Sequence, residues 1–191
     1  MEGIMIEIEG SGKHCHVTRE TLDVLFGSGF DLEPKKMLTQ PGQFLSHQKV
    51  TLTGPRGTAE ISIVGPCRPS DQIELSFTDA RSLGFDPPIR ESGDVSGSNA
   101  CKLTGPQGEV ELSEGVIIMQ RHVHLAPADA EKFGIADKQI VKLKVVGPRA
   151  LVFDEVIART GPLHATYAHI DYDEINAAAI TAANIMGEII K

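Results

Sequence analysis

The sequence contains no tryptophan, only two tyrosines and three cysteines, and no excess of positive charge. Lys and Arg number 18 against 26 Asp and Glu, so the formal net charge is −8, and we expect no nucleic-acid partner and no membrane-surface role. The cysteines are widely spaced and odd in number, which favours reduced thiols over a disulfide framework or a C-x-x-C zinc site. No apolar run approaches the roughly 18–20 residues of a membrane-spanning helix. The 191 residues are therefore expected to form one domain or two small ones.

The first residues show neither the basic segment nor the apolar stretch of a secretory signal. We therefore expect a cytoplasmic location.

Glycine and proline are frequent, with 19 and 11 residues, and they separate short runs of Val, Ile, Leu and Thr. This pattern predicts a mainly β protein with tight turns. The clearest hairpin joins residues 49–53 and 58–64 through Gly54-Pro55-Arg56-Gly57, with alternating polarity on both arms. The Leu-Thr-Gly-Pro-x-Gly turn recurs within residues 102–112, and residues 145–149 form a looser third copy.

A second repeat carries the histidines. Residues 4–27 and 116–134 each read as a strand, a His-x-His pair and a short helix that ends at Phe-Gly. Thr18 is a suitable N-cap for the first helix, and Pro127 opens the second. The repeat predicts two related halves that face one another.

Two further segments allow structural predictions. Residues 84–94 are rich in turn formers and are either a linker or an ordered active-site loop. The C-terminal segment, which starts at Asp171, predicts a longer helix with one apolar face, formed by Ile175, Ala179, Ala182, Met186 and Ile190.

Two His-x-His pairs, His14 with His16 and His122 with His124, point to the chemistry of the protein. Residues i and i+2 on a strand point to the same side, so both imidazoles can reach one metal ion. Imidazole ligands favour Zn²⁺ or another borderline divalent ion. One such pair could equally be two exposed strand histidines, but two pairs in the same local pattern favour a metal role.

Each pair needs further ligands from elsewhere. Glu74 and His169 are polar residues in otherwise apolar strands and are candidates, although a solvent-facing Glu74 or a His169 without a metal is also compatible with the pattern. Arg68 follows a strand and carries a guanidinium fork that can hold phosphate, or it can form a surface salt bridge. Cys15 is expected to face away from its histidine neighbours and to pack in the core. His47 and His164 are expected to lie on the surface.

Eight segments in a fixed order resemble the PduL-type phosphate acyltransferases (phosphotransacylases) over nearly the whole chain. They are Lys13-His14-Cys15-His16, Gln40-Pro41-Gly42-Gln43-Phe44, Gly65-Pro66-Cys67-Arg68, Gln72-Ile73-Glu74-Leu75-Ser76, Thr78-Asp79-Ala80, residues 87–94, Arg121-His122-Val123-His124 and residues 169–177.

The resemblance implies a mainly β fold of two small β-barrel domains capped by short helices, with the active site between them. Residues 1–12 plus 120–191 would form the first barrel, in which the N-terminal strand completes the C-terminal barrel. Residues 13–119 would form the second.

The resemblance also implies two divalent metal ions, usually zinc. The ligands of one would be His14, His16 and Glu74, and this metal would also meet the coenzyme A sulfur. The ligands of the other would be His122, His124 and His169. Arg68 matches the family's arginine beside the metals and the bound phosphate. Three positions match residues that line the site, namely Ser11, Lys36 and Asn176.

The implied reaction interconverts a short-chain acyl-CoA (acetyl or propanoyl) plus phosphate with acyl phosphate plus coenzyme A. Lys13 stands where the family usually has arginine, so any role of that arginine is open here. We expect no microcompartment-targeting extension before the first strand, and therefore a free cytoplasmic enzyme. The sequence is compatible with a homo-oligomer and does not fix the oligomeric state.

Two alternatives compete with this interpretation. A cupin-like barrel is suggested because His14, His16, Glu20 and Gly27 copy the spacing of the first cupin motif, but the second motif is absent. A non-catalytic metal-binding β-barrel protein is the other, and it predicts closed coordination with no open position.

Overall fold

A computed structural model describes residues 4–180 and 185–191. The protein is mainly β, and the chain divides into two compact units. The first unit consists of the described residues of Met1–Ser11, Thr39–Pro41 and Gln120–Lys191, and the second consists of Gly12–Leu38 and Gly42–Met119. Each contains a closed ring of six strands and two short helices among the described residues, so the expected pair of small barrels capped by short helices is confirmed.

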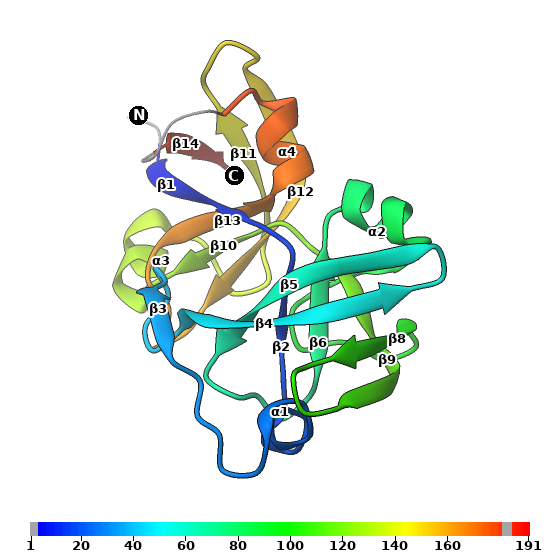
Figure 1. Cartoon of the computed structure of the whole chain (residues 1–191). Coiled ribbons are helices and arrows are strands. Elements are labelled where there is room, and N and C mark those ends of the chain that lie inside the picture. The colour runs from blue at the N-terminus through cyan, green and yellow to red at the C-terminus, as the bar shows by residue number, and fades with distance from the viewer. Residues whose placement is uncertain (1–3, 181–184) are drawn as a thin grey trace. The chain divides into compact units, whose positions relative to one another are not determined.

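The first barrel closes around strands from both ends of the chain. In ring order its strands are β1 (Ile4–Ser11), β13 (Tyr167–Asp171), β10 (His122–Leu125), β12 (Leu151–Thr160), β11 (Ile140–Val145) and β14 (Ile185–Ile190). Figure 1 shows the blue N-terminal strand beside the dark red C-terminal strand, to which it is paired antiparallel. Helices α3 (Pro127–Phe133) and α4 (Tyr172–Ala177) complete the unit, whose core includes Val123, Leu143 and Ile170.

The second barrel is built from strands nearly continuous in sequence. Its ring is β4 (Phe44–Gly54), β5 (Gly57–Gly65), β2 (His14–His16), β6 (Gln72–Leu75), β9 (Glu109–Met119) and β8 (Asn99–Thr104), which pairs back onto β4. Strands β3 (Pro34–Met37) and β7 (Ile89–Arg90) extend the sheet, and helices α1 (Arg19–Phe26) and α2 (Phe77–Leu83) belong to the same unit. Leu52, Ile63 and Leu103 are among its fully buried side chains.

The two barrels repeat the same pairing pattern, as the sequence repeat predicts. Strand β2 runs parallel to β5 and antiparallel to β6, just as β10 runs parallel to β12 and antiparallel to β13. Strand β6 then pairs in parallel with β9, and β13 with β1. The first strand of each half is therefore exchanged: β1 precedes β2 in the chain but pairs in the barrel of β10, and β9 precedes β10 but pairs in the barrel of β2.

The predicted starts of the two short helices that follow the His-x-His pairs are confirmed. Thr18 caps α1 by accepting a hydrogen bond from the Thr21 amide, and Pro127 is the first residue of α3. Helix α3 ends at Gly134, which has the left-handed conformation that glycine tolerates best.

The predicted long C-terminal helix is wrong. Helix α4 ends at Ala177, and residues 185–190 form strand β14, which pairs with both β1 and β11 and closes the ring. Ala179 has a φ of 53°, which a continuing helix cannot accommodate. Alanine-rich spacing favoured a helix locally, but the open edges of β1 and β11 require a strand. Ala182 of the predicted apolar face lies outside the described residues.

The two units differ from the expected domains in two places. Gly12 belongs to the second unit and not to the first, and Thr39–Pro41 belongs to the first unit, although it was expected within residues 13–119. The Gln40 side chain donates to the Ala165 carbonyl and accepts from the Ala165 amide, and the Thr39 hydroxyl donates to Glu9. These hydrogen bonds join the segment to β1 and to the loop before β13.

The repeated Leu-Thr-Gly-Pro-x-Gly turns have a packing reason. A Cβ at Gly105 would lie 2.5 Å from the Leu25 carbonyl oxygen of α1, and one at Gly54 would lie 2.5 Å from the Leu83 carbonyl oxygen of α2. Each hairpin tip therefore needs glycine because it meets the backbone at the end of a helix.

We expect Gly105→Ala to lower the free energy of unfolding by about 1–3 kcal/mol, because neither backbone can yield without cost. Gly147→Ala, in the looser third copy, is the matched control, since its Cβ would lie 3.8 Å from the nearest atom. Urea denaturation of both variants measures the difference, and equal stabilities would contradict this account of the turn.

None of the helices in residues 4–180 and 185–191 has the length and apolar character needed to cross a membrane.

Candidate metal centres

The second barrel brings together the side chains of His14, His16 and Glu74. Antiparallel pairing of β2 with β6 sets His14 opposite Glu74. The His14 Nε2 atom lies 3.2 Å from His16 Nε2 and 3.5 Å from Glu74 Oε2, and His16 Nε2 lies 3.9 Å from Glu74 Oε1. His16 and Glu74 are buried. The structure thus brings together the three residues that the family resemblance implies as ligands of one metal ion, and their ligand role stays a prediction.

The first barrel repeats the arrangement with a third histidine in place of the carboxylate. Strand β10 pairs antiparallel with β13, and His122 stands opposite His169. The His122 and His124 Nε2 atoms are 3.1 Å apart, and the ligand atoms of the three residues all lie within 4.8 Å of one another. All three histidines are buried.

The residues of the second barrel fit a divalent metal ion. The Nδ1 atoms of His14 and His16 lie 2.8 and 3.1 Å from the carbonyl oxygens of Gly12 and Val64. A carbonyl only accepts, so each Nδ1 carries the proton and each Nε2 presents a lone pair. Two lone pairs 3.2 Å apart repel unless a proton or a cation lies between them. Tetrahedral Zn²⁺ with Zn–N distances of about 2.0–2.1 Å sets its ligand atoms about 3.3–3.4 Å apart, close to this spacing.

The residues of the first barrel also fit a metal ion. The His122 Nδ1 atom is 2.9 Å from the Gln120 carbonyl oxygen, so its Nε2 likewise presents a lone pair toward His124. The His124 Nδ1 atom is buried with no hydrogen-bond partner within the described residues. Its ring is held instead by neighbouring imidazoles.

Burial keeps the imidazoles of His16 and His124 neutral. The pKa of His16 is lowered to about 3, first by burial and then by the neighbouring His14 and Arg68. The pKa of His124 is also lowered, first by burial and then by His122 and His169. Because metals bind the neutral imidazole, both sites hold these ligands in the binding form at neutral pH.

His169 is supported by groups from distant parts of the chain. Its Nδ1 lies 3.5 Å from Glu9 Oε2, and the same Glu9 oxygen accepts a 2.6 Å hydrogen bond from the Thr39 hydroxyl. The Gln40 amide nitrogen is 3.4 Å from His169 Nε2. A carboxylate behind a metal-binding histidine commonly fixes the orientation of its ring.

Arg68 belongs to the second unit, and its positive charge is one of the causes that lower the pKa of His16. Its Nη1 donates to the Ser92 hydroxyl at 3.0 Å, and its Nη2 lies 3.5 Å from Gln43 Oε1. Ser92 lies in the turn-rich segment 84–94, so the contact favours the ordered loop over the linker. The half-buried guanidinium is held by neutral hydroxyl and amide groups in these two contacts.

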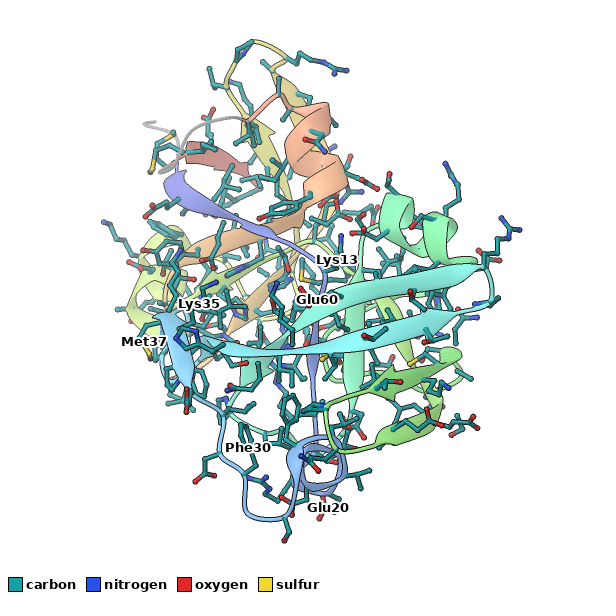
Figure 2. All side chains as sticks on the ribbon, in the orientation of Figure 1. Lys13, Glu20, Phe30, Lys35, Met37 and Glu60 are labelled. Atoms are coloured by element: carbon teal, nitrogen blue, oxygen red, sulfur yellow. The ribbon has the colours of Figure 1, made fainter. Side chains whose placement is uncertain are left out.

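The three positions predicted to line the site are located as follows. Ser11 is the last residue of β1, and Asn176 is exposed on α4. Lys36 is exposed on β3, between Lys35 and Met37, which Figure 2 labels. Among the described residues none of the three belongs to either triad, so their roles stay predictions.

Sequence reasoning missed several supporting residues. His164 was expected on the surface, but its ring packs edge-on against His124, with centroids 4.2 Å apart. Glu9 is not among the candidates that the sequence offers. Gln40, Gln72 and Ser92 occur there only as members of the family-like segments, and that position is the one signal that could point to them. His47 is exposed and Cys15 is buried, as expected.

The cupin alternative does not match the geometry. Glu20 is exposed on α1, where Figure 2 labels it, whereas the carboxylate that meets His14 and His16 is Glu74.

Comparison with known proteins gives a consistent result. A model of the phosphate propanoyltransferase family matches residues 7–181. A phosphate propanoyltransferase of Clostridioides difficile is 46% identical over 187 residues, which cover 97% of this chain and 89% of that protein. Those of Listeria monocytogenes and Thermotoga maritima are 44% and 43% identical, over 97% and 96% of this chain and 87% and 88% of theirs.

Proposed function

We propose that the chain, which belongs to the phosphate propanoyltransferase family, moves a short acyl group between coenzyme A and phosphate with the help of two divalent metal ions, preferably Zn²⁺. As a member of this family it is an acyltransferase enzyme. The reaction interconverts acyl-CoA plus phosphate with acyl phosphate plus coenzyme A. Its cytoplasmic location stays a prediction.

One observation carries the proposal. The lone pairs of His14 and His16 converge with the Glu74 carboxylate at ligand spacing, and the unit that holds them also holds Arg68. Three protein ligands leave a fourth tetrahedral position for a substrate atom, as catalytic zinc sites do. This supports an enzyme over a closed structural site.

The two triads and Arg68 have separate roles in this proposal. His14, His16 and Glu74 would hold one metal ion, and His122, His124 and His169 the other. A bound Zn²⁺ supplies Lewis-acid polarisation of the thioester and stabilises a thiolate leaving group. Arg68 orients the phosphate through two parallel N–H groups and offsets its charge.

Phosphate itself is the nucleophile in this proposal. One of its oxygens forms the new bond to the acyl carbon, the C–S bond breaks, and the sulfur leaves with its electron pair as coenzyme A thiolate. The cysteines of the chain support the absence of an acyl-enzyme. Burial raises the pKa of Cys15 and of Cys67, and it raises that of Cys101 to about 12, so none of these thiols is a ready nucleophile at neutral pH.

The test is phosphate-dependent release of free thiol from acetyl-, propanoyl- and butanoyl-coenzyme A. We expect release with at least one of them, with sequential kinetics and no acylated protein after incubation without phosphate. No phosphate-dependent release from any of the three would contradict the function, and a covalently acylated chain would contradict direct attack.

A further inference from the structure

Gln72 lies in the interior of the second unit, between the metal-binding carboxylate and the arginine. Its side chain is almost fully buried, with 1% of the residue exposed. It stands two residues before Glu74 on β6, so both side chains point to the same face of the strand. A neutral amide in this place needs a reason, because a buried polar group is costly unless it is fully hydrogen-bonded.

All the hydrogen-bonding groups of this amide are engaged. Its Nε2 donates to Glu74 Oε1 at 2.6 Å and to the Ser92 hydroxyl at 2.8 Å, and its Oε1 accepts from the Gly93 amide at 2.7 Å. The Gly93 amide only donates and the Glu74 carboxylate only accepts, so the amide has one possible orientation.

This arrangement fixes Glu74. Its Oε1 is held by Gln72, while its Oε2 faces His14 Nε2 at 3.5 Å. Gln72 therefore fixes the rotamer in which the Glu74 carboxylate meets His14 and His16.

The same amide reaches Arg68 through Ser92. The Ser92 hydroxyl oxygen accepts from Gln72 at 2.8 Å and from Arg68 Nη1 at 3.0 Å. A continuous path of hydrogen bonds thus runs from Glu74 through Gln72 and Ser92 to Arg68.

We propose that Gln72 is a positioning residue that orients Glu74 for metal binding and, through Ser92, aligns Arg68 for phosphate. The inference rests on the proposed function. It adds that the metal affinity of the Glu74 triad and the phosphate affinity of Arg68 both depend on the buried Gln72 amide.

The test replaces Gln72 by Met, which has a similar shape and no charge but cannot donate. Competition with a chromophoric chelator should show one of two zinc sites weakened by about 10- to 100-fold. Repeating the titration in a His124→Ala background, which disrupts the other triad, assigns the loss to the Glu74 triad. The visible spectrum of the cobalt-substituted protein should change as well, because it reports ligand geometry.

Two further variants serve to test the metal-binding end and the phosphate-binding end of this path separately. Ser92→Ala keeps the bond from Gln72 to Glu74, so metal affinity should be unchanged while the KM for phosphate rises about 5-fold, the worth of one hydrogen bond. Tyr167→Phe changes the position equivalent to Gln72 in the first barrel, since Tyr167 pairs with His124 as Gln72 pairs with His16. Its hydroxyl interacts with Glu7, so both metal affinities should be unchanged.

The outcomes are distinct. If Gln72→Met retains two sites of wild-type affinity and the wild-type cobalt spectrum, the inference is overturned and the proposed function is untouched. If it loses both sites together with its circular dichroism signal, Gln72 is needed for folding and the positioning role is rejected. If the wild-type chain binds no metal ion, the proposed function and this inference fail together.

Discussion

Replacing Glu74 or His122 by alanine is expected to abolish acyl phosphate formation, with a loss of roughly 10³-fold or more in kcat/KM. Each substitution removes one of three ligands from a proposed metal centre. Metal analysis should find about one zinc ion per chain in place of two. Phosphate-dependent thiol release measures the activity, and circular dichroism confirms that the barrels remain folded.

The matched control for His122→Ala is His47→Ala, which makes the same chemical change at an exposed position. We expect it to retain wild-type activity and two metal ions. Near-normal activity in a metal-stripped His122→Ala variant would contradict the account of the metal centres.

Replacing Arg68 by glutamine is expected to raise the KM for phosphate and to lower kcat/KM by roughly 10²- to 10⁴-fold, since two charge-assisted hydrogen bonds are lost. The KM for acyl-CoA should change much less. Arg68→Lys keeps the charge but loses the planar fork, so an intermediate loss is expected. Steady-state kinetics with either substrate varied measure both constants.

Arg56→Gln, at an exposed arginine of the same unit, provides the control and should leave both constants unchanged. If Arg68→Gln and Arg56→Gln had the same KM for phosphate, Arg68 would not be the residue that holds it.

The proposed metal ligands could be identified in the sequence because local patterns indicate them. His14 and His16 lie on one strand, and i, i+2 spacing alone aligns their imidazoles. Glu74 and His169 could be found because a polar side chain interrupts an apolar strand. The choice of these two as partners of the histidine pairs still required the family resemblance.

The supporting residues could not be predicted because strand pairing brings them together. Glu9 reaches His169 only because β1 lies parallel to β13, a pairing between the two ends of the chain. Gln40 joins the first unit through hydrogen bonds to Ala165, which is distant in the sequence. No local sequence pattern indicates that contact. Pairing across long sequence separations is set by the whole barrel.

The C-terminal error has the same origin. An alanine-rich segment with helical spacing has favourable local propensity, but the barrel needs a strand between β1 and β11. Ile185, Gly187 and Ile189 alternate with Met186, Glu188 and Ile190 in a strand pattern as well. The two periods compete in this segment, and ring closure decides between them.

The most direct test of the central claim is activity before and after removal of metal from one preparation. The protein is treated with chelator, desalted, assayed for phosphate-dependent thiol release with the preferred acyl-CoA, and assayed again after titration with Zn²⁺. The account predicts loss of activity on chelation and its recovery as two equivalents of Zn²⁺ per chain are bound. Full activity in a chain shown by metal analysis to hold no divalent ion would contradict it.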